Sequence, residues 1–304
     1  MRSYNVIGLD NIRSLLKHDD ARELNVSAIK VSPKSVKEMV DDILLSGKRV
    51  IFTMGKGGVG KTTVAAAIAV GLADRGKKVY LATTDPAHHI QNALSAHESI
   101  TTGFIDEKAE LKKYQEEVLA KARATMSAND VAYVEEDLRS PCTQEIAVFR
   151  AFAEIVEKTD NEIVVIDTAP SGHTLLLLDS TQSYHREVER TQGGNIPESV
   201  KQLLPRLRDE QQTAVIIVTL AEATPVYEAL RLEEDLFRAK IAVRYWAINS
   251  SFYKAKPVGL LKSKAAAEVE WINTVGTHTN GSYVLIPWFW DEVKDTHLNA
   301  ILES

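Results

Sequence analysis

The chain has 304 residues, a formal net charge of −6, 44% apolar and 26% charged residues, and a single cysteine. These proportions are ordinary for a soluble globular protein, and the length suits one large domain or two small ones. The acidic balance argues against a general nucleic-acid binder, and one cysteine excludes an internal disulfide. No apolar run approaches the ~20 residues of a membrane helix, and Met1-Arg2-Ser3 leads into no apolar signal core, so we expect a cytoplasmic protein.

Residues 1–20 stand apart from the rest of the chain. An apolar triplet, Ile12, Leu15 and Leu16, repeats the spacing of a later triplet at Leu298, Ile301 and Leu302. This match has two interpretations: residues 1–20 are the tail of a preceding, similar unit, or two unrelated amphipathic helices share the spacing by accident. Residues 21–31 have the pattern of a linker. One domain is then expected over residues 32–304, with Ser32-Pro33 opening a helix that Gly47 closes.

Apolar strand patterns alternate with helical patterns along this domain. The expected strands cover residues 49–54, 78–83, 162–167, 213–220, 243–249 and 282–286. The expected helices cover residues 61–75, 144–158, 174–190, 225–239, 262–275 and 295–302. A polar, helical stretch at 106–137 predicts a helical insertion over about 106–158, between the second and third strands. The alternation predicts an α/β fold, with a mostly parallel sheet flanked by helices on both faces.

The first strand runs straight into Gly55-Lys56-Gly57-Gly58-Val59-Gly60-Lys61-Thr62-Thr63, which fits the phosphate-binding pattern G-x-x-x-x-G-K-[ST]. Its glycines let backbone N–H groups close around phosphate oxygens, and the following helix adds its positive N-terminal end. Lys61 is expected to reach the β- and γ-phosphates of ATP, and the Thr62 hydroxyl to hold Mg²⁺. The strand, loop and helix therefore predict a P-loop NTPase.

Two aspartates follow strands at the edge where open α/β sheets bind ligands. Asp167 ends a buried strand and is expected to hold Mg²⁺ directly or through water. Asp85 is expected to hold Mg²⁺ together with Thr62 and to orient the attacking water. Either carboxylate taken alone is more often a helix cap or turn former. Lys56 cannot share the phosphates of Lys61 without like-charge cost, so it is either a solvated loop lysine or a finger that reaches nucleotide in a facing subunit.

The run 55–63 resembles the deviant Walker A, or signature-lysine, P-loop ATPases, which include the septum-positioning, partition and nitrogenase-iron-protein families. Three longer segments narrow the resemblance to the arsenite-transport (arsenical pump-driving) ATPases: Thr83-Thr84-Asp85-Pro86-Ala87-His88, Glu136-Asp137-Leu138-Arg139-Ser140-Pro141-Cys142-Thr143 and Asp167-Thr168-Ala169-Pro170-Ser171-Gly172-His173-Thr174-Leu175. They look like the first switch, the metalloid-site segment and the second switch of that family. The similarity runs from about residue 49 onward and is nearest to the C-terminal half of tandem members, whose two halves face each other.

The resemblance implies roles for these residues. Lys56 would contact nucleotide across the interface with a second ATPase unit, either in a homodimer or in the paired half of a tandem. Asp85 would lie near the hydrolytic water and Asp167 would report nucleotide state. Asn249 and the loop at Pro287 would contact adenine. The family pattern is broken at Ser250, Ala221 and Asp295, so the adenine contacts are expected to be less well defined than the phosphate contacts.

The resemblance also implies a site for trivalent arsenic or antimony at Cys142, with Ser140 and His173 nearby. Trivalent arsenic prefers thiolate ligands, although a lone cysteine is usually a small buried apolar residue. One thiolate is too few, so further soft ligands would come from another chain or from small thiols. The expected function is Mg²⁺-dependent ATP hydrolysis that energises arsenite export, stimulated by metalloid. The ATPase would bind a membrane efflux pump peripherally, at the inner face of the membrane.

Three alternatives stay open at this point. An ATPase that targets tail-anchored membrane proteins is disfavoured, because Cys142 alone cannot form the Cys-x-x-Cys zinc site of eukaryotic members and only four methionines are present. A partition-type positioning switch is disfavoured, because the acidic balance and the short C-terminus supply no clear basic patch or amphipathic terminal tail. A catalytically dead half that only pairs is disfavoured by intact Lys61, Thr62, Asp85 and Asp167.

Overall fold

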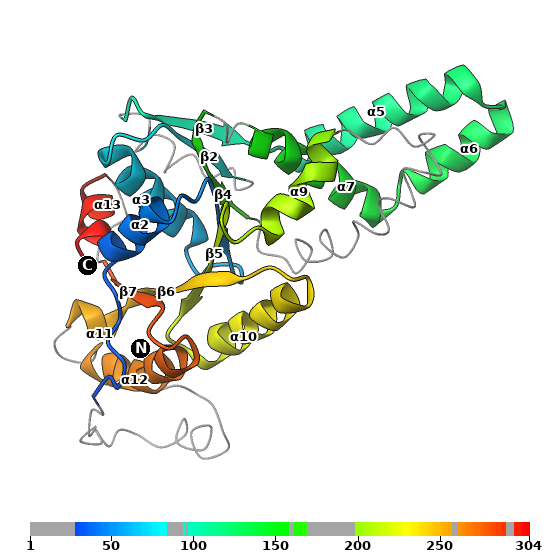
Figure 1. The fold of residues 1–304 in the computed structure, drawn as a ribbon. Coiled ribbons are helices and arrows are strands. Elements are labelled where there is room, and N and C mark those ends of the chain that lie inside the picture. The colour runs from blue at the N-terminus through cyan, green and yellow to red at the C-terminus, as the bar shows by residue number, and fades with distance from the viewer. Residues whose placement is uncertain are drawn as a thin grey trace, which may run out of the picture.

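The structure is a computed structural model that describes residues 28–83, 94, 97–157, 161–168, 198–256, 261–289 and 295–304. Its centre is a seven-stranded parallel sheet with the strand order β3-β2-β4-β1-β5-β6-β7 (Figure 1). The strands are β1 (Val50–Met54), β2 (Val79–Thr83), β3 (Ile100–Phe104), β4 (Ile163–Asp167), β5 (Thr213–Leu220), β6 (Val243–Ser251) and β7 (Tyr283–Pro287). The expected α/β class is confirmed.

The central strands are runs of Val, Ile and other apolar residues with almost no polar alternation. β1, β4 and β5 are buried along nearly their whole length, which is the pattern of parallel strands covered on both faces. β1 lies between β4 and β5, with Thr53 opposite Asp167 on one side and Ile216 on the other. Since all strands run the same way, the carboxyl ends of β1, β2, β4, β6 and β7 lie at one edge of the sheet.

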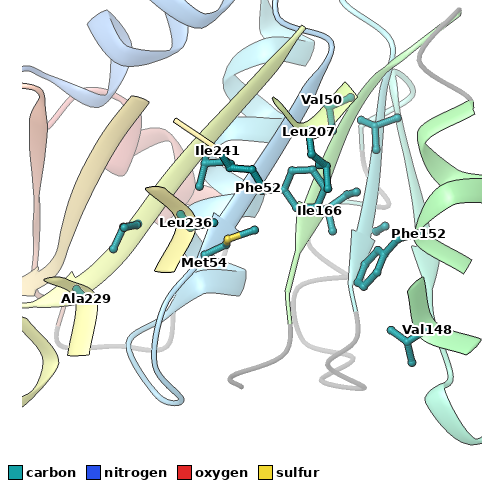
Figure 2. Close-up of a cluster of buried hydrophobic side chains, with 14 of the residues drawn as sticks. Val50, Phe52, Met54, Val148, Phe152, Ile166, Leu207, Ala229, Leu236 and Ile241 are labelled. Carbon is teal, nitrogen blue, oxygen red and sulfur yellow. The ribbon is translucent and has the colours of Figure 1, made fainter. Parts of the chain in front are cut away.

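Helices cover both faces of the sheet (Figure 1). One layer consists of α2 (Val36–Leu45), α3 (Lys61–Asp74) and α13 (Asp295–Leu302), which contact one another. The other face carries α7 (Pro141–Val156), α9 (Glu198–Arg208), α10 (Ala223–Arg238) and α12 (Leu261–His278), with the short α11 (Phe252–Ala255) beside β7. Figure 2 shows part of this second core, where Phe52 and Ile166 of the sheet lie near Phe152 and Leu207 of the helices.

An arm of two helices, α5 (Glu107–Thr125) and α6 (Ala128–Asp137), projects away from the sheet (Figure 1). Asp106 and Ser127 cap their first turns through backbone N–H groups. The expected helical insertion is therefore present, and it lies between the strands at Val79–Thr83 and Ile163–Asp167 as expected. The unforeseen β3 precedes it, so the insertion joins β3 to β4.

Several expected boundaries are corrected. The first helix begins at Val36 and not at Ser32-Pro33, because Ser35 and Glu38 form a reciprocal capping box with N···O distances of 2.7 and 3.1 Å. Gly47, with φ of +72°, follows the end of that helix as expected. The helix expected from residue 144 begins at Pro141, and α9 was not foreseen. Residues 1–20, the helix expected at 174–190 and most of the linker lie outside the described residues.

Within the described part of the chain, no helix is long and apolar enough to span a membrane.

Candidate nucleotide-binding site

The glycine loop between β1 and α3 has a backbone conformation that residues with a Cβ rarely adopt. Gly55, Gly58 and Gly60 have φ values of +152°, +80° and +87°. A Cβ on Gly55 would lie 2.2 Å from the carbonyl oxygen of Val218, and one on Gly60 would lie 2.1 Å from Nδ2 of Asn249. The loop is thus packed against β5 and β6. Gly55 and Gly60 are required both by their backbone conformation and by the closeness of these strands, and Gly58 by its backbone conformation.

Helix α3 begins at this loop without a side-chain cap. Its N-cap is Gly60, and the first helical hydrogen bond joins Val64 N to Gly60 O at 3.1 Å. The N–H groups of a first helical turn have no partner within the helix and carry the positive end of the helix dipole. An uncapped turn next to a glycine loop is a geometry that suits a phosphate.

The two lysines of the loop are placed differently. Lys61 is only 7% exposed, and its Nζ donates a hydrogen bond to the backbone carbonyl of Lys56 at 3.2 Å. Its side chain therefore folds back over the loop that is expected to hold phosphates. Lys56, in contrast, is exposed. The structure thus distinguishes a buried lysine, Lys61, from a solvent-exposed one, Lys56, within the same loop.

At the edge of the sheet, Asp167 joins the loop to the neighbouring strand. Its Oδ2 accepts hydrogen bonds from Oγ1 of Thr62 at 2.6 Å and from Oγ1 of Thr83 at 2.9 Å, and the residue is 2% exposed. A hydroxyl and a carboxylate are hard oxygen donors of the kind that Mg²⁺ prefers. Thr62 and Asp167 therefore fit a Mg²⁺ ion. Thr83 was not foreseen as a site residue, and its position as the last residue of β2 is the signal that could have found it.

The other end of the site is formed by β6 and β7. Asn249 is 6% exposed, and its Nδ2 donates to the backbone carbonyl of Val59 at 3.0 Å. Pro287 ends β7 opposite Ser251 in the strand register. After it, Trp288 stacks on Phe252 with ring centroids 4.8 Å apart. The structure thus brings the glycine loop, Asp167 and Asn249 together, with Pro287 on the strand next to Asn249.

Some expected site residues are not placed by the structure. Asp85 and His173 lie outside the described residues. Cys142 is the second residue of α7, but only its backbone is described. Ser140 is the exposed N-cap of the same helix, and its Oγ lies 3.1 Å from Oγ1 of Thr143. Among the side chains that are described, no group of three or more His, Cys, Asp or Glu could hold a metal ion.

The chain is similar in sequence to known ATPases. Residues 48–194 match the family model of the anion-transporting ATPases. An arsenical pump-driving ATPase of Escherichia coli is 40% identical over 294 residues, covering 94% of this chain and 50% of that protein. A second Escherichia coli protein of the same name is 43% identical over 255 residues, covering 83% of this chain and 43% of that protein. An ATPase ASNA1 homolog of Dictyostelium discoideum is 25% identical over 272 residues, covering 78% and 82%.

The chain thus spans about half the length of these arsenical pump-driving relatives. The matched domain begins just before β1 and contains the glycine loop, the arm and β4. The chain therefore belongs to the family of anion-transporting ATPases.

Proposed function

We propose that this chain hydrolyses ATP with Mg²⁺. The observation that carries the proposal is the contact between Thr62 and Asp167 at the end of an uncapped, glycine-lined loop. Backbone N–H groups of residues 55–63 would bind the phosphates, and Lys61 would neutralise the β- and γ-phosphates. Bound Mg²⁺, held by Thr62 with Asp85 or Asp167, would polarise the phosphate oxygens. Asp85 would orient the attacking water.

The base of the nucleotide would lie toward the carboxyl ends of β6 and β7. Asn249 supports this part of the proposal, because it is buried against the loop and its amide already contacts the Val59 carbonyl. Pro287 would provide an apolar surface on the next strand. Adenine and phosphates would then be bound by segments that contact each other, so the two ends of the ligand would be held at a fixed spacing.

The chain would act together with a second ATPase unit, either another copy of itself or a paired half. Lys56, an exposed residue of the loop, is suited to reach nucleotide in a facing unit. That the relatives are about twice as long as the aligned region is consistent with two such units. If Lys56 of one unit contacts the nucleotide of the other, ATP hydrolysis would require the two units to associate.

The function of the pair would be to energise export of arsenite or antimonite through a membrane pump, with the ATPase bound at the inner face of the membrane. The names of the relatives support this substrate class. Trivalent metalloid would bind at Cys142, near Ser140 and His173. Cys142 lies in the first turn of α7, where a helix N-terminus favours the thiolate form that soft metalloids require.

The test is the ATPase rate of the full chain with and without antimonite, in wild type and in Cys142→Ser. Antimonite should stimulate the wild type and leave the variant at its basal rate. Undiminished stimulation of Cys142→Ser would reject the ligand role of this cysteine while leaving ATP hydrolysis in place. Absence of stimulation in both proteins, together with binding of a hydrophobic tail peptide, would favour the targeting of tail-anchored membrane proteins instead.

A further inference from the structure

A buried carboxylate on α12 organises the junction between β6 and α11. Glu268 is 4% exposed and accepts three hydrogen bonds: from Oγ of Ser251 at 2.8 Å, from N of Phe252 at 3.1 Å and from N of Tyr253 at 3.0 Å. The last two donors are the first N–H groups of α11, which have no partner within that helix. Glu268 therefore caps α11 from another helix, across 15 to 17 positions of sequence.

This junction connects two parts of the proposed nucleotide site. On one side, Asn249 lies two residues before Ser251 and contacts the glycine loop through the Val59 carbonyl. On the other side, the carbonyl of Ser251 accepts a hydrogen bond from Trp288 N at 3.0 Å, and Phe252 stacks on the Trp288 ring. Because these contacts all begin within four residues of chain, whatever holds that segment also sets how β7 lies relative to the loop.

The backbone of the junction has an uncommon conformation, which the hydrogen bonds to Glu268 help to stabilise. Ser250, between Asn249 and Ser251, has a φ of +54°, which non-glycine residues seldom adopt. Burial raises the pKa of Glu268, and the hydrogen bonds from Tyr253, Ser251 and Phe252 act against that rise. A carboxyl group taken out of water in this way is costly unless its donors are in place. The arrangement therefore stabilises one conformation of residues 249–253 over others.

We propose that Glu268 is a positioning residue for the base end of the nucleotide site, acting through Ser251 and the first turn of α11 on Asn249 and on the Pro287-Trp288 segment. The inference rests on the proposed nucleotide function and deepens it. It assigns selectivity for the adenine base to a residue that does not touch the nucleotide. The phosphate end has its own contact between Thr62 and Asp167, so we expect it to depend on Glu268 much less than the base end does.

The experiment separates the two ends of the ligand. Isothermal titration calorimetry would measure binding of Mg·ATP, Mg·GTP and Mg·tripolyphosphate, a probe without a base, to wild type, Glu268→Gln and the control Glu270→Gln. Glu270 is an exposed carboxylate on the same helix. Glutamine keeps the shape of Glu268 but turns an NH₂ group toward one of its donors. We expect the ATP dissociation constant to rise about tenfold and the preference for ATP over GTP to fall accordingly.

Tripolyphosphate affinity should change much less than ATP affinity in Glu268→Gln, and kcat at saturating ATP should stay within about twofold of wild type. Equal weakening of all three ligands, or no change in any, would overturn the positioning role. Ser251→Ala removes one of the three hydrogen bonds and decides the matter if Glu268→Gln fails to fold. It should show the same selective loss at smaller size. If the wild type binds neither ATP nor tripolyphosphate, the nucleotide proposal itself fails, and this inference with it.

Discussion

Helices α3 and α5 are both long, yet they are held in the molecule in opposite ways. Eleven of the fourteen residues of α3 are buried, whereas α5 buries three of its nineteen. α3 packs against the sheet, α2 and α13, while α5 packs mainly on α7 and α6. A helix enclosed on every side fixes the loop from which it starts. A helix held along one narrow seam leaves its outer part free of the sheet, so the two regions should respond differently to substitution.

The largest expected effect is on function at the start of α3. Lys61→Met keeps the long apolar stem of the side chain and removes the charge that the proposed site uses for the phosphates. We expect the ATPase rate to fall by about 10²-fold or more, without loss of the fold. Steady-state ATPase assays together with circular dichroism would check this. A variant that keeps wild-type activity would show that the rigid end of α3 is not where phosphate is bound.

Packing around α3 should tolerate little added volume. A Cβ on Gly71 would lie 2.7 Å from Cδ2 of Leu302 and 3.3 Å from Val40, so Gly71→Val would overfill this layer. We expect a loss of about 2 kcal/mol in the free energy of unfolding, measured with urea. Ala120→Val adds a branched side chain to an exposed position of α5 and is the matched control. Equal losses in the two variants would contradict the contrast between the helices.

In the arm, intrinsic helix preference should matter more than packing. Ala120→Gly leaves every buried contact of α5 intact but introduces the residue with the greatest backbone freedom. The expected cost is about 1 kcal/mol. Hydrogen exchange would localise it: amides of α5 and α6 should lose protection, while amides of α3 keep theirs. Loss of protection in α3 as well would mean that arm and sheet unfold as one unit.

The smallest effect concerns the ion pair that ties α2 to α3. Nε of Arg75 donates to Oδ1 of Asp41 at 2.6 Å, and this hydrogen bond lowers the pKa of Asp41 below its usual 3.8. A lowered carboxyl pKa stabilises the fold above the unfolded-state pKa, and that contribution is lost as pH falls through the folded-state value. Asp41→Asn should therefore cost less than about 1 kcal/mol at pH 7 and still less at pH 3. Urea unfolding would measure the loss in the free energy of unfolding at both pH values. An equal loss at the two values would show that the Arg75–Asp41 ion pair does not stabilise the fold in this way.

The sequence alone was sufficient where local pattern and tertiary environment coincide. The buried apolar runs of β1, β4 and β5 predicted central strands, and the glycine loop between β1 and α3 was placed correctly. β3 was missed because Ile100–Phe104 is an edge strand with only its first residue buried. Gly103 in that strand lies beneath the Tyr80 ring, where a Cβ would come within 1.9 Å of the hydroxyl oxygen. The residues next to Gly103 in the sequence do not reveal that this position must lack a Cβ.

The site shows the same limit. Lys61, Thr62 and Asp167 were predicted because motif spacing and strand ends identify them. Thr83 and Glu268 were not, because each acts through a partner far away in sequence, 84 positions in the first case. Helix α9 was missed because Pro205 within it is normally a helix breaker. Long-range hydrogen bonds of single polar residues leave no periodic trace, so only a three-dimensional structure finds them.

The position of α13 has a consequence for synthesis. Leu298, Ile301 and Leu302 complete the cover over α2 and α3, and the carbonyl of Ser304 accepts a hydrogen bond from Val36 N at 3.3 Å. During translation, the apolar helix α3 at residues 61–74 is synthesised more than 200 residues before α13, which covers it in the folded protein. Until α13 has been synthesised, the apolar surface of α3 that packs against it stays uncovered. Newly made chains should therefore need protection from self-association at this stage, for example by a cotranslational chaperone.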